Sequence, residues 1–239
     1  MNAQGKGLEQ HEILKVQLMR GEKEQDYLTH IWNLTSMMDH PIIAKEEDQD
    51  EACYRQFYEE AISLCRQKRF HEVLEKCRYT SLDDEEEYSI DVIQPEKIEF
   101  KQNSYEDGEN SIISFPEFLL LVLDVCTGGE QPASHYQPDK LIEKFDALKT
   151  YFTAGEFYEK MLYYRLLLDY YTIRRDIKDG QGNYSLILKG PKDDSDKLKQ
   201  YQSMLYVSTE AFYNWLKPYL RKLEQDELHS CAEMLAFLK

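Results

Sequence analysis

The sequence predicts a mainly α-helical fold, a multi-helix bundle with one long acidic loop and at most a small β-hairpin. Three observations lead to this prediction. Over most of the chain, apolar residues recur at spacings of three and four, which places them on one face of a helix. A polar, acidic stretch without that period, residues 80–113, separates a helical part at 1–79 from a second at 114–239. Within the second part, two β-prone runs flank a glycine-containing turn.

The first predicted subdomain, residues 1–79, carries four apolar stripes with helical spacing. Gly21 ends the first stripe, and His40-Pro41 ends the second because the residue before a proline disfavours the helical conformation. We therefore expect four helices in this part. They centre on Leu14 and Leu18, on Leu28 to Leu34, on Phe57 to Leu64, and on Phe70 to Cys77, with a break near 67–69 between the last two.

Residues 80–113 are predicted to form a long acidic loop and the main internal boundary of the chain. The segment is rich in acid at 83–87, and it contains Pro95 and Gly108, which interrupt regular structure. At most, short strands are expected near Ile90–Ile93 and Ile98–Phe100.

A strong helix is predicted to open the second subdomain, residues 114–239. Ser114 can cap it, Glu117 completes a capping box, and Pro116 is tolerated in the first turn. The helix is apolar almost all round until Gly128-Gly129 stops it. We therefore expect it to lie in the centre of the core, with Phe118–Leu123 buried.

The rest of the second subdomain is predicted to be helical apart from one hairpin. Between Tyr171 and Leu188, β-prone runs flank the turn Asp179–Asn183, which predicts the hairpin. Pro218 is expected to kink or split the helix that contains Trp215. The helical stripes run from Leu141 to Phe152, from Phe157 to Tyr171, from Leu198 to Leu205, from Phe212 to Leu216, and from Leu228 to Leu238.

Charge and composition argue against several classes of function. The formal net charge is −16, so broad contact with nucleic acid would need a local basic patch to overcome this field. No apolar run approaches roughly 18 residues and no secretory signal pattern is present, so we expect a cytoplasmic protein that does not bind membranes. Five scattered cysteines indicate reduced core thiols, and six histidines lack metal-ligand spacing. We therefore expect no metal and no cofactor.

One cluster leaves two interpretations open. Four tyrosines gather on one predicted helix with arginines nearby. The first interpretation is core packing with hydroxyl groups at the rim, and the second is a stacking platform for bases. The tyrosines are Tyr163, Tyr164, Tyr170 and Tyr171, and the arginines are Arg165, Arg174 and Arg175.

Three separated blocks carry a resemblance. The first is MNAQGKGLEQHEILKVQLM at 1–19, the second combines FPEFLL at 115–120 with YRLLLDYYTIRR at 164–175, and the third is YQSMLYVS at 201–208, followed by Asn214-Trp215-Leu216. Together they resemble a helical portion of the GmrSD-type restriction proteins, which carry a ParB/sulfiredoxin-like N-terminal domain. Gln4 stands where that family usually has arginine. The family's Asp-Gly-Gln-Gln-Arg motif and its His-Asn-His nuclease domain are missing from this sequence.

The resemblance implies a helical scaffold or interaction portion of a modification-dependent, phage-defence restriction system. Such a portion would support a nucleotide-sensing domain and couple it to a nuclease, without a complete catalytic site and without activity as an enzyme on its own. Its partners would be other domains or subunits of the system, with DNA or nucleotide bound only in the complete assembly. The chain is then expected to be part of a larger protein.

The alternative is a protein of another class, a stand-alone nucleotide- or nucleic-acid-binding helical protein. It would use the local basic charge of this otherwise acidic chain. The candidate contacts for nucleotide or nucleic acid are Asn2, Gly5, Arg165, Tyr171, Arg174 and Arg175.

The N-terminal segment gives a further expectation. If a preceding domain is missing, residues 1–7 lack packing partners and should fray. Leu8, Leu14 and Leu18 would then expose apolar surface, which favours self-association. We therefore expect a homodimer that forms through this helix.

Overall fold

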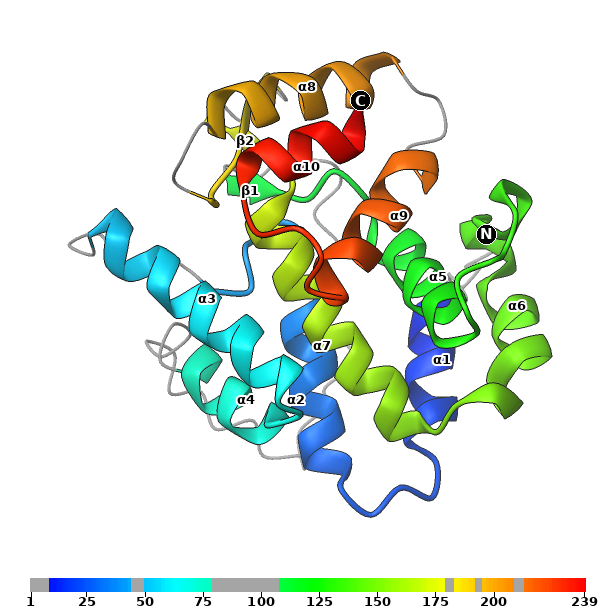
Figure 1. Cartoon of the computed structure of the whole chain (residues 1–239). Coiled ribbons are helices and arrows are strands. Elements are labelled where there is room, and N and C mark those ends of the chain that lie inside the picture. The colour runs from blue at the N-terminus through cyan, green and yellow to red at the C-terminus, as the bar shows by residue number, and fades with distance from the viewer. Residues whose placement is uncertain (1–8, 44–49, 79–107, 179–182, 192–194, 209–212) are drawn as a thin grey trace, which may run out of the picture.

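The computed structural model describes residues 9–43, 50–78, 108–178, 183–191, 195–208 and 213–239. Within these residues the fold is mainly α-helical, as predicted, with ten α-helices and one three-stranded antiparallel sheet (Figure 1). The helices are α1 (Gln10–Met19), α2 (Gln25–Ser36), α3 (Glu51–Arg66), α4 (Phe70–Arg78), α5 (Phe115–Cys126), α6 (Leu141–Leu148), α7 (Ala154–Tyr171), α8 (Ser195–Ser208), α9 (Tyr213–Glu224) and α10 (Cys231–Leu238). The strands are β1 (Gly108–Asn110), β2 (Arg174–Ile177) and β3 (Tyr184–Ile187).

Helix α7 is the central element of the molecule. It packs against α2 and α3 and also against α5 and α9, which surround it in Figure 1. Every residue from Met161 to Tyr170 is buried. A helix that is buried on all sides needs apolar residues around its whole circumference, so the two charged residues inside this stretch, Arg165 and Asp169, must find partners in the interior.

Helix α5 confirms the predicted core helix. All six side chains from Phe118 to Leu123 are 0% exposed. The predicted capping box is present, with the Ser114 N–H donating to Glu117 at 2.8 Å. Gly128 and Gly129 follow the helix with φ values of 102° and 76°, the left-handed region that favours glycine.

The sheet is larger than the predicted hairpin. Strands β2 and β3 form that hairpin, and β1 pairs antiparallel with the other edge of β2, with Gly108 opposite Ile177. The predicted hairpin is therefore confirmed, and the third strand, β1, was not predicted. Strand β1 has the sequence Gly-Glu-Asn, which shows no apolar alternation, and its partner lies far along the chain.

The end of the predicted acidic loop belongs to the folded body. After β1, Ile112 and Ile113 are buried in the same hydrophobic cluster as residues from both predicted subdomains. The strands expected near Ile90–Ile93 and Ile98–Phe100 lie outside the described residues. The division into parts at 1–79, 80–113 and 114–239 stays a prediction.

Helix α1 corrects the expectation of an exposed apolar face. Leu14 and Leu18 are buried, because α1 packs against α6 and α2 of the same chain. The face that remains open carries Val16, which is 67% exposed. Residues 1–7 and Leu8 lie outside the described residues. Homodimer formation stays a prediction, but Leu14 and Leu18 do not support it.

Helix α9 is not split by Pro218. It runs from Tyr213 to Glu224 with the proline inside it. Proline removes one helical hydrogen bond, whereas the apolar face of α9 buries Leu216, Tyr219 and Leu220 completely. Burial of this face stabilises the helix and offsets the loss of the main-chain hydrogen bond at Pro218.

Candidate functional site

A cluster of three charged residues lies in the interior, where α7 meets the sheet. We call Arg165, Asp169 and Arg174 the arginine–aspartate cluster. Arg165 and Asp169 are four residues apart on α7 and therefore lie on one face of the helix, where Arg165 Nε is 3.0 Å from Asp169 Oδ1. Arg174, the first residue of β2, contacts the same oxygen. All three residues are at most 1% exposed.

The remaining donors of Arg165 bind main-chain carbonyl groups at the end of α2 and in the segment that follows it. Arg165 donates to the carbonyls of Thr35 and Met37, each at 2.9 Å, and to that of His40 at 2.5 Å. In return, Asp169 Oδ2 accepts the main-chain N–H of Ile42 at 2.6 Å. Arg165 and Asp169 therefore hold the segment 35–43 against α7. Burial lowers the pKa of Arg165, and the neighbouring Asp169 carboxylate opposes that shift.

Arg174 connects the same cluster to the sheet. Its Nε donates to the Glu109 carbonyl of β1 at 2.9 Å, and the N–H of Ser111 donates to the Met38 carbonyl at 2.7 Å. The cluster therefore joins α7, the segment 35–43 and β1, three parts of the chain that are distant in sequence. Buried charges that are fully hydrogen-bonded in this way fix a geometry rather than bind a ligand.

Two tyrosines of α3 hold the C-terminal end of the segment 35–43. The hydroxyl groups of Tyr54 and Tyr58 donate to the Ile43 carbonyl at 3.0 Å and 3.3 Å. Tyr58 also stacks on Tyr170 of α7, with ring centroids 5.3 Å apart. Burial raises the pKa of Tyr58 well above its ordinary value, so this hydroxyl stays protonated and can keep donating.

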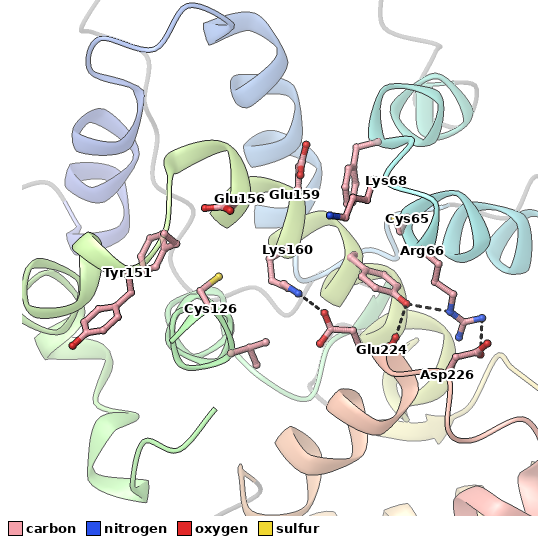
Figure 2. Close-up of a pocket in the computed structure, with 14 residues that line it drawn as sticks. Cys65, Arg66, Lys68, Cys126, Tyr151, Glu156, Glu159, Lys160, Glu224 and Asp226 are labelled. Atoms are coloured by element: carbon pink, nitrogen blue, oxygen red, sulfur yellow. Dashed lines mark hydrogen bonds and ion pairs between the residues drawn. The ribbon is translucent and has the colours of Figure 1, made fainter. Parts of the chain in front are cut away.

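A groove lies between the α3–α4 turn, α7, and the C-terminal ends of α5 and α9 (Figure 2). It encloses about 700 Å³. Most charges in it are paired across the groove: Lys160 of α7 contacts Glu224 of α9, and Arg66 of α3 lies 2.9 Å from Asp226. Tyr151, at its rim, is 69% exposed.

Two carboxylates of the groove form no ion pair across it with a described residue, and one of them, Glu156, is hydrogen-bonded to Thr153 at the start of α7. Glu159 forms no hydrogen bond or ion pair with a described residue, and burial raises its pKa. The two thiols in the lining are poor nucleophiles, because burial raises the pKa of Cys126 to about 12 and that of Cys65 further still. The groove therefore offers a shaped, charged surface but no activated nucleophile.

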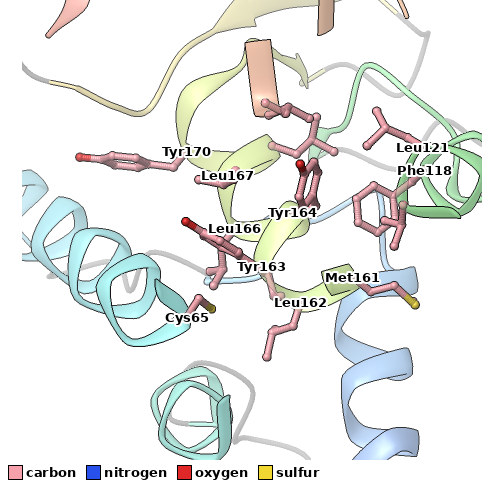
Figure 3. Close-up of a cluster of buried hydrophobic side chains, with 14 of the residues drawn as sticks. Cys65, Phe118, Leu121, Met161, Leu162, Tyr163, Tyr164, Leu166, Leu167 and Tyr170 are labelled. Carbon is pink, nitrogen blue, oxygen red and sulfur yellow. The ribbon is translucent and has the colours of Figure 1, made fainter. Parts of the chain in front are cut away.

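The tyrosine cluster predicted from the sequence is part of the core. Tyr163, Tyr164 and Tyr170 are buried along α7, and Figure 3 shows them among its leucines, with Tyr164 on the side of Phe118 and Leu121 of α5. Their hydroxyl groups reach polar partners, as in the bond from Tyr164 to Glu224 at 2.6 Å. This arrangement matches the packing interpretation of the cluster.

The structure does not gather the predicted contact residues on one surface. Arg165 and Arg174 are buried in the arginine–aspartate cluster. Arg175 follows Arg174 on β2 and donates to the Ser111 carbonyl at 2.8 Å. The partly buried Tyr171 carries a pKa raised by burial. Asn2 and Gly5 lie outside the described residues.

Sequence reasoning missed Asp169 as the partner of both arginines. The spacing of four residues between Arg165 and Asp169, inside an otherwise apolar helix, was a signal for a buried pair. The pairs of the groove, such as Lys160 with Glu224, carried no local signal because their members are far apart in sequence.

Several site types find no support in the described residues. No group of three or more His, Cys, Asp or Glu side chains there could hold a metal ion. Every described helix lacks either the length or the apolar character needed to cross a membrane. No family model, curated protein or solved structure matches this chain.

Proposed function

We propose that this chain is a helical scaffold and interaction module of a modification-dependent, phage-defence restriction system. In this proposal it works in the cytoplasm, holds other domains or subunits of the system in place, and has no complete catalytic site of its own. DNA and nucleotide are bound only by the complete assembly.

The arginine–aspartate cluster is the observation that carries the proposal. Its three members all belong to the second block that resembles the restriction family, YRLLLDYYTIRR at 164–175. Their donors and acceptors are used inside the molecule, where they fix α7 to the segment 35–43 and to β1. The polar residues of the resembling block therefore support a rigid frame, which is what a scaffold requires.

The groove of Figure 2 supports the interaction part of the proposal. It is concave, four of its charges are fixed in the pairs of Arg66 with Asp226 and of Lys160 with Glu224, and an exposed tyrosine lies at its rim. Rigid aromatic residues beside fixed polar groups are frequent anchors of protein interfaces. Tyr151 is therefore the side chain whose loss should weaken a contact made by this groove.

The test is reconstitution from separate parts. The chain is co-expressed with the ParB/sulfiredoxin-like domain and the His-Asn-His nuclease domain of a GmrSD-type protein, and complex formation and nucleotide-dependent cleavage of modified DNA are measured. We expect a three-part complex that cleaves DNA, and no cleavage by the chain alone. If neither domain co-purifies with the chain, the proposal is wrong.

Two matched variants locate the contact. Tyr151→Ala removes the exposed aromatic residue at the groove, and Tyr184→Ala removes another exposed aromatic residue on β3. We expect only Tyr151→Ala to weaken the complex. Equal binding by both variants would remove the groove from the proposal and place the contact elsewhere on the scaffold.

The alternative inferred from the sequence is a stand-alone protein that binds nucleotides or nucleic acid through Arg165, Arg174 and Arg175. It requires these guanidinium groups to leave their present acceptors, so the geometry favours it less. Salt-sensitive binding of the purified chain to single-stranded DNA, duplex DNA or nucleoside triphosphates, lost in Arg175→Gln, would support this alternative instead.

A further inference from the structure

A second, smaller cavity lies between α9 and the loop that follows α5. It encloses about 210 Å³, and its lining contains two cationic side chains, Lys217 and Arg221, but no aspartate or glutamate. The two cations are four residues apart, so they lie on the same side of α9. Although the net charge of the chain is −16, this lining carries two positive charges and no acid, which favours an anionic ligand.

Lys217 is held in place by contacts with Asp124 and with the loop after α5. Its ammonium group lies 2.9 Å from Asp124 Oδ2 and donates to the Gln131 carbonyl at 3.2 Å. Asp124 is completely buried and also accepts the Tyr136 hydroxyl at 2.5 Å and the Gln131 N–H at 2.9 Å. Asp124 therefore offsets the charge of Lys217 and fixes its position.

Most N–H donors of the Arg221 guanidinium group have no acceptor among the described residues. Among the described residues it forms no ion pair, and its side chain makes a single hydrogen bond, from Nη1 to the Gly129 carbonyl at 3.5 Å. That distance is at the long limit for such a bond. A Cβ atom at Gly129 would lie 2.4 Å from Arg221 Nη1, so the glycine makes room for the guanidinium group against the loop. The positive charge of Arg221 is therefore available to a ligand.

The size and donor set of the cavity define the ligand. At about 210 Å³ it is below the roughly 300–1,000 Å³ of sites for drug-sized molecules, so it fits one small group. A carboxylate pairs with a guanidinium group through both of its oxygens, whereas a phosphate in the same position keeps further oxygens that can accept from Lys217 and from the side-chain amide of Asn214, which also lines the cavity.

We propose that this cavity binds a phosphate group, with Arg221 as the main contact and with Lys217 and the Asn214 amide as further donors. The phosphate is either free inorganic phosphate or the terminal group of a small molecule. This proposal is independent of the scaffold function, because it rests on α9 and the loop at 129–136 and not on the arginine–aspartate cluster.

The test is a binding titration of the purified full chain. Inorganic phosphate, pyrophosphate and a nucleoside triphosphate are titrated by calorimetry at constant ionic strength, with chloride as the reference anion. Arg221→Gln should weaken phosphate binding by about tenfold, because it removes a charge-assisted contact. Arg221→Lys should bind with intermediate affinity, because it keeps the charge but loses the paired donors.

Lys222→Gln is the matched control. It removes a positive charge from the next residue of α9, whose side chain pairs with Glu227 at 2.5 Å and does not line the cavity. We expect this variant to bind phosphate like the unmodified chain. If Arg221→Gln does not fold, as judged by its melting curve, Asn214→Ala replaces it, since Asn214 is exposed and its loss should also weaken binding.

The outcomes separate the two sources of phosphate. Tighter binding of pyrophosphate or the nucleotide identifies a phosphate carried by a larger small molecule, and equal or tighter binding of inorganic phosphate identifies the free ion. The proposal is overturned if no anion binds beyond the chloride reference. It is equally overturned if the Arg221 or Asn214 variant binds phosphate as tightly as Lys222→Gln.

Discussion

Replacing Asp169 by asparagine is the sharpest test of the frame around α7. The change keeps the size of the side chain but removes the negative charge between Arg165 and Arg174. The new amide must also place an N–H group either toward the arginine donors or toward the Ile42 N–H, which now bonds to Oδ2 at 2.6 Å. In both orientations a donor faces a donor in a buried site, so the substitution leaves charge and hydrogen bonds unsatisfied.

The expected cost follows from the burial of the pair. Removing one partner of a buried ion pair costs about 3–5 kcal/mol of unfolding free energy. For a chain of this size, each kcal/mol lowers the melting temperature by roughly 2–4 °C, so we expect a decrease of about 6–20 °C. The free energy is measured by urea unfolding at neutral pH, and the temperature by a thermal melt followed by circular dichroism.

Asp146→Asn is the control for this experiment. Asp146 lies 2.8 Å from Lys149 in an ion pair whose two side chains are about half exposed to solvent. Solvent screens such a pair, so the same chemical change should cost less than about 1 kcal/mol. If Asp169→Asn and Asp146→Asn unfold at the same urea concentration, the arginine–aspartate cluster does not hold the fold together and the scaffold argument fails.

Three further predictions concern the core, the thiols and the groove. Leu120→Ala should cost about 2–5 kcal/mol, because the side chain is fully buried in α5; a melt equal to that of the unmodified chain would show that α5 is not central. In the native chain, a thiol reagent should modify the exposed Cys53 first and Cys77 only after unfolding, because Cys77 is buried and its pKa is raised to about 12; rapid labelling of both would contradict this. Burial raises the pKa of Glu159, so the folded chain loses stability as pH rises through the ordinary carboxylate range and this side chain ionises. Glu159→Gln should therefore be more stable than the unmodified chain at neutral pH. The difference should vanish below about pH 4, where the carboxyl group is protonated in both the folded and the unfolded chain. Urea unfolding at both pH values measures this, and a difference that does not depend on pH would refute it.

Local signals explain the parts of the fold that could be predicted. The start of α5 is set by Ser114 and Glu117 and its end by Gly128-Gly129, all within a few residues of the helix. Its almost entirely apolar sequence predicted central burial, which needs no knowledge of the neighbours. The fold class followed because most helices of the chain carry signals of this kind.

Long-range partners explain the parts that could not be predicted. Strand β1 consists of three polar or small residues, and only its register with β2, more than sixty residues later, makes it a strand. Leu14 and Leu18 looked like an open apolar face because nothing in the sequence near them shows that α6 and α2 cover them. In both cases the deciding contact is made by a segment that no local pattern identifies.

The arginines of this chain show why a candidate site is harder to predict than a helix. Arg174 and Arg221 are the same residue type, and each donates to a main-chain carbonyl group, that of Glu109 in β1 and that of Gly129 after α5. Arg174 donates hydrogen bonds to Asp169 and to the Glu109 carbonyl inside the core. Arg221 donates one long hydrogen bond, to the Gly129 carbonyl at the edge of a cavity. An arginine can bind a ligand only through donors that the protein has not already satisfied. The sequence shows where the arginines are, but the acceptors that bind their guanidinium groups lie on other helices, strands and loops. The residues that looked basic and available therefore became part of the frame, and the available charge lies on α9, where the sequence drew attention only to tryptophan and proline.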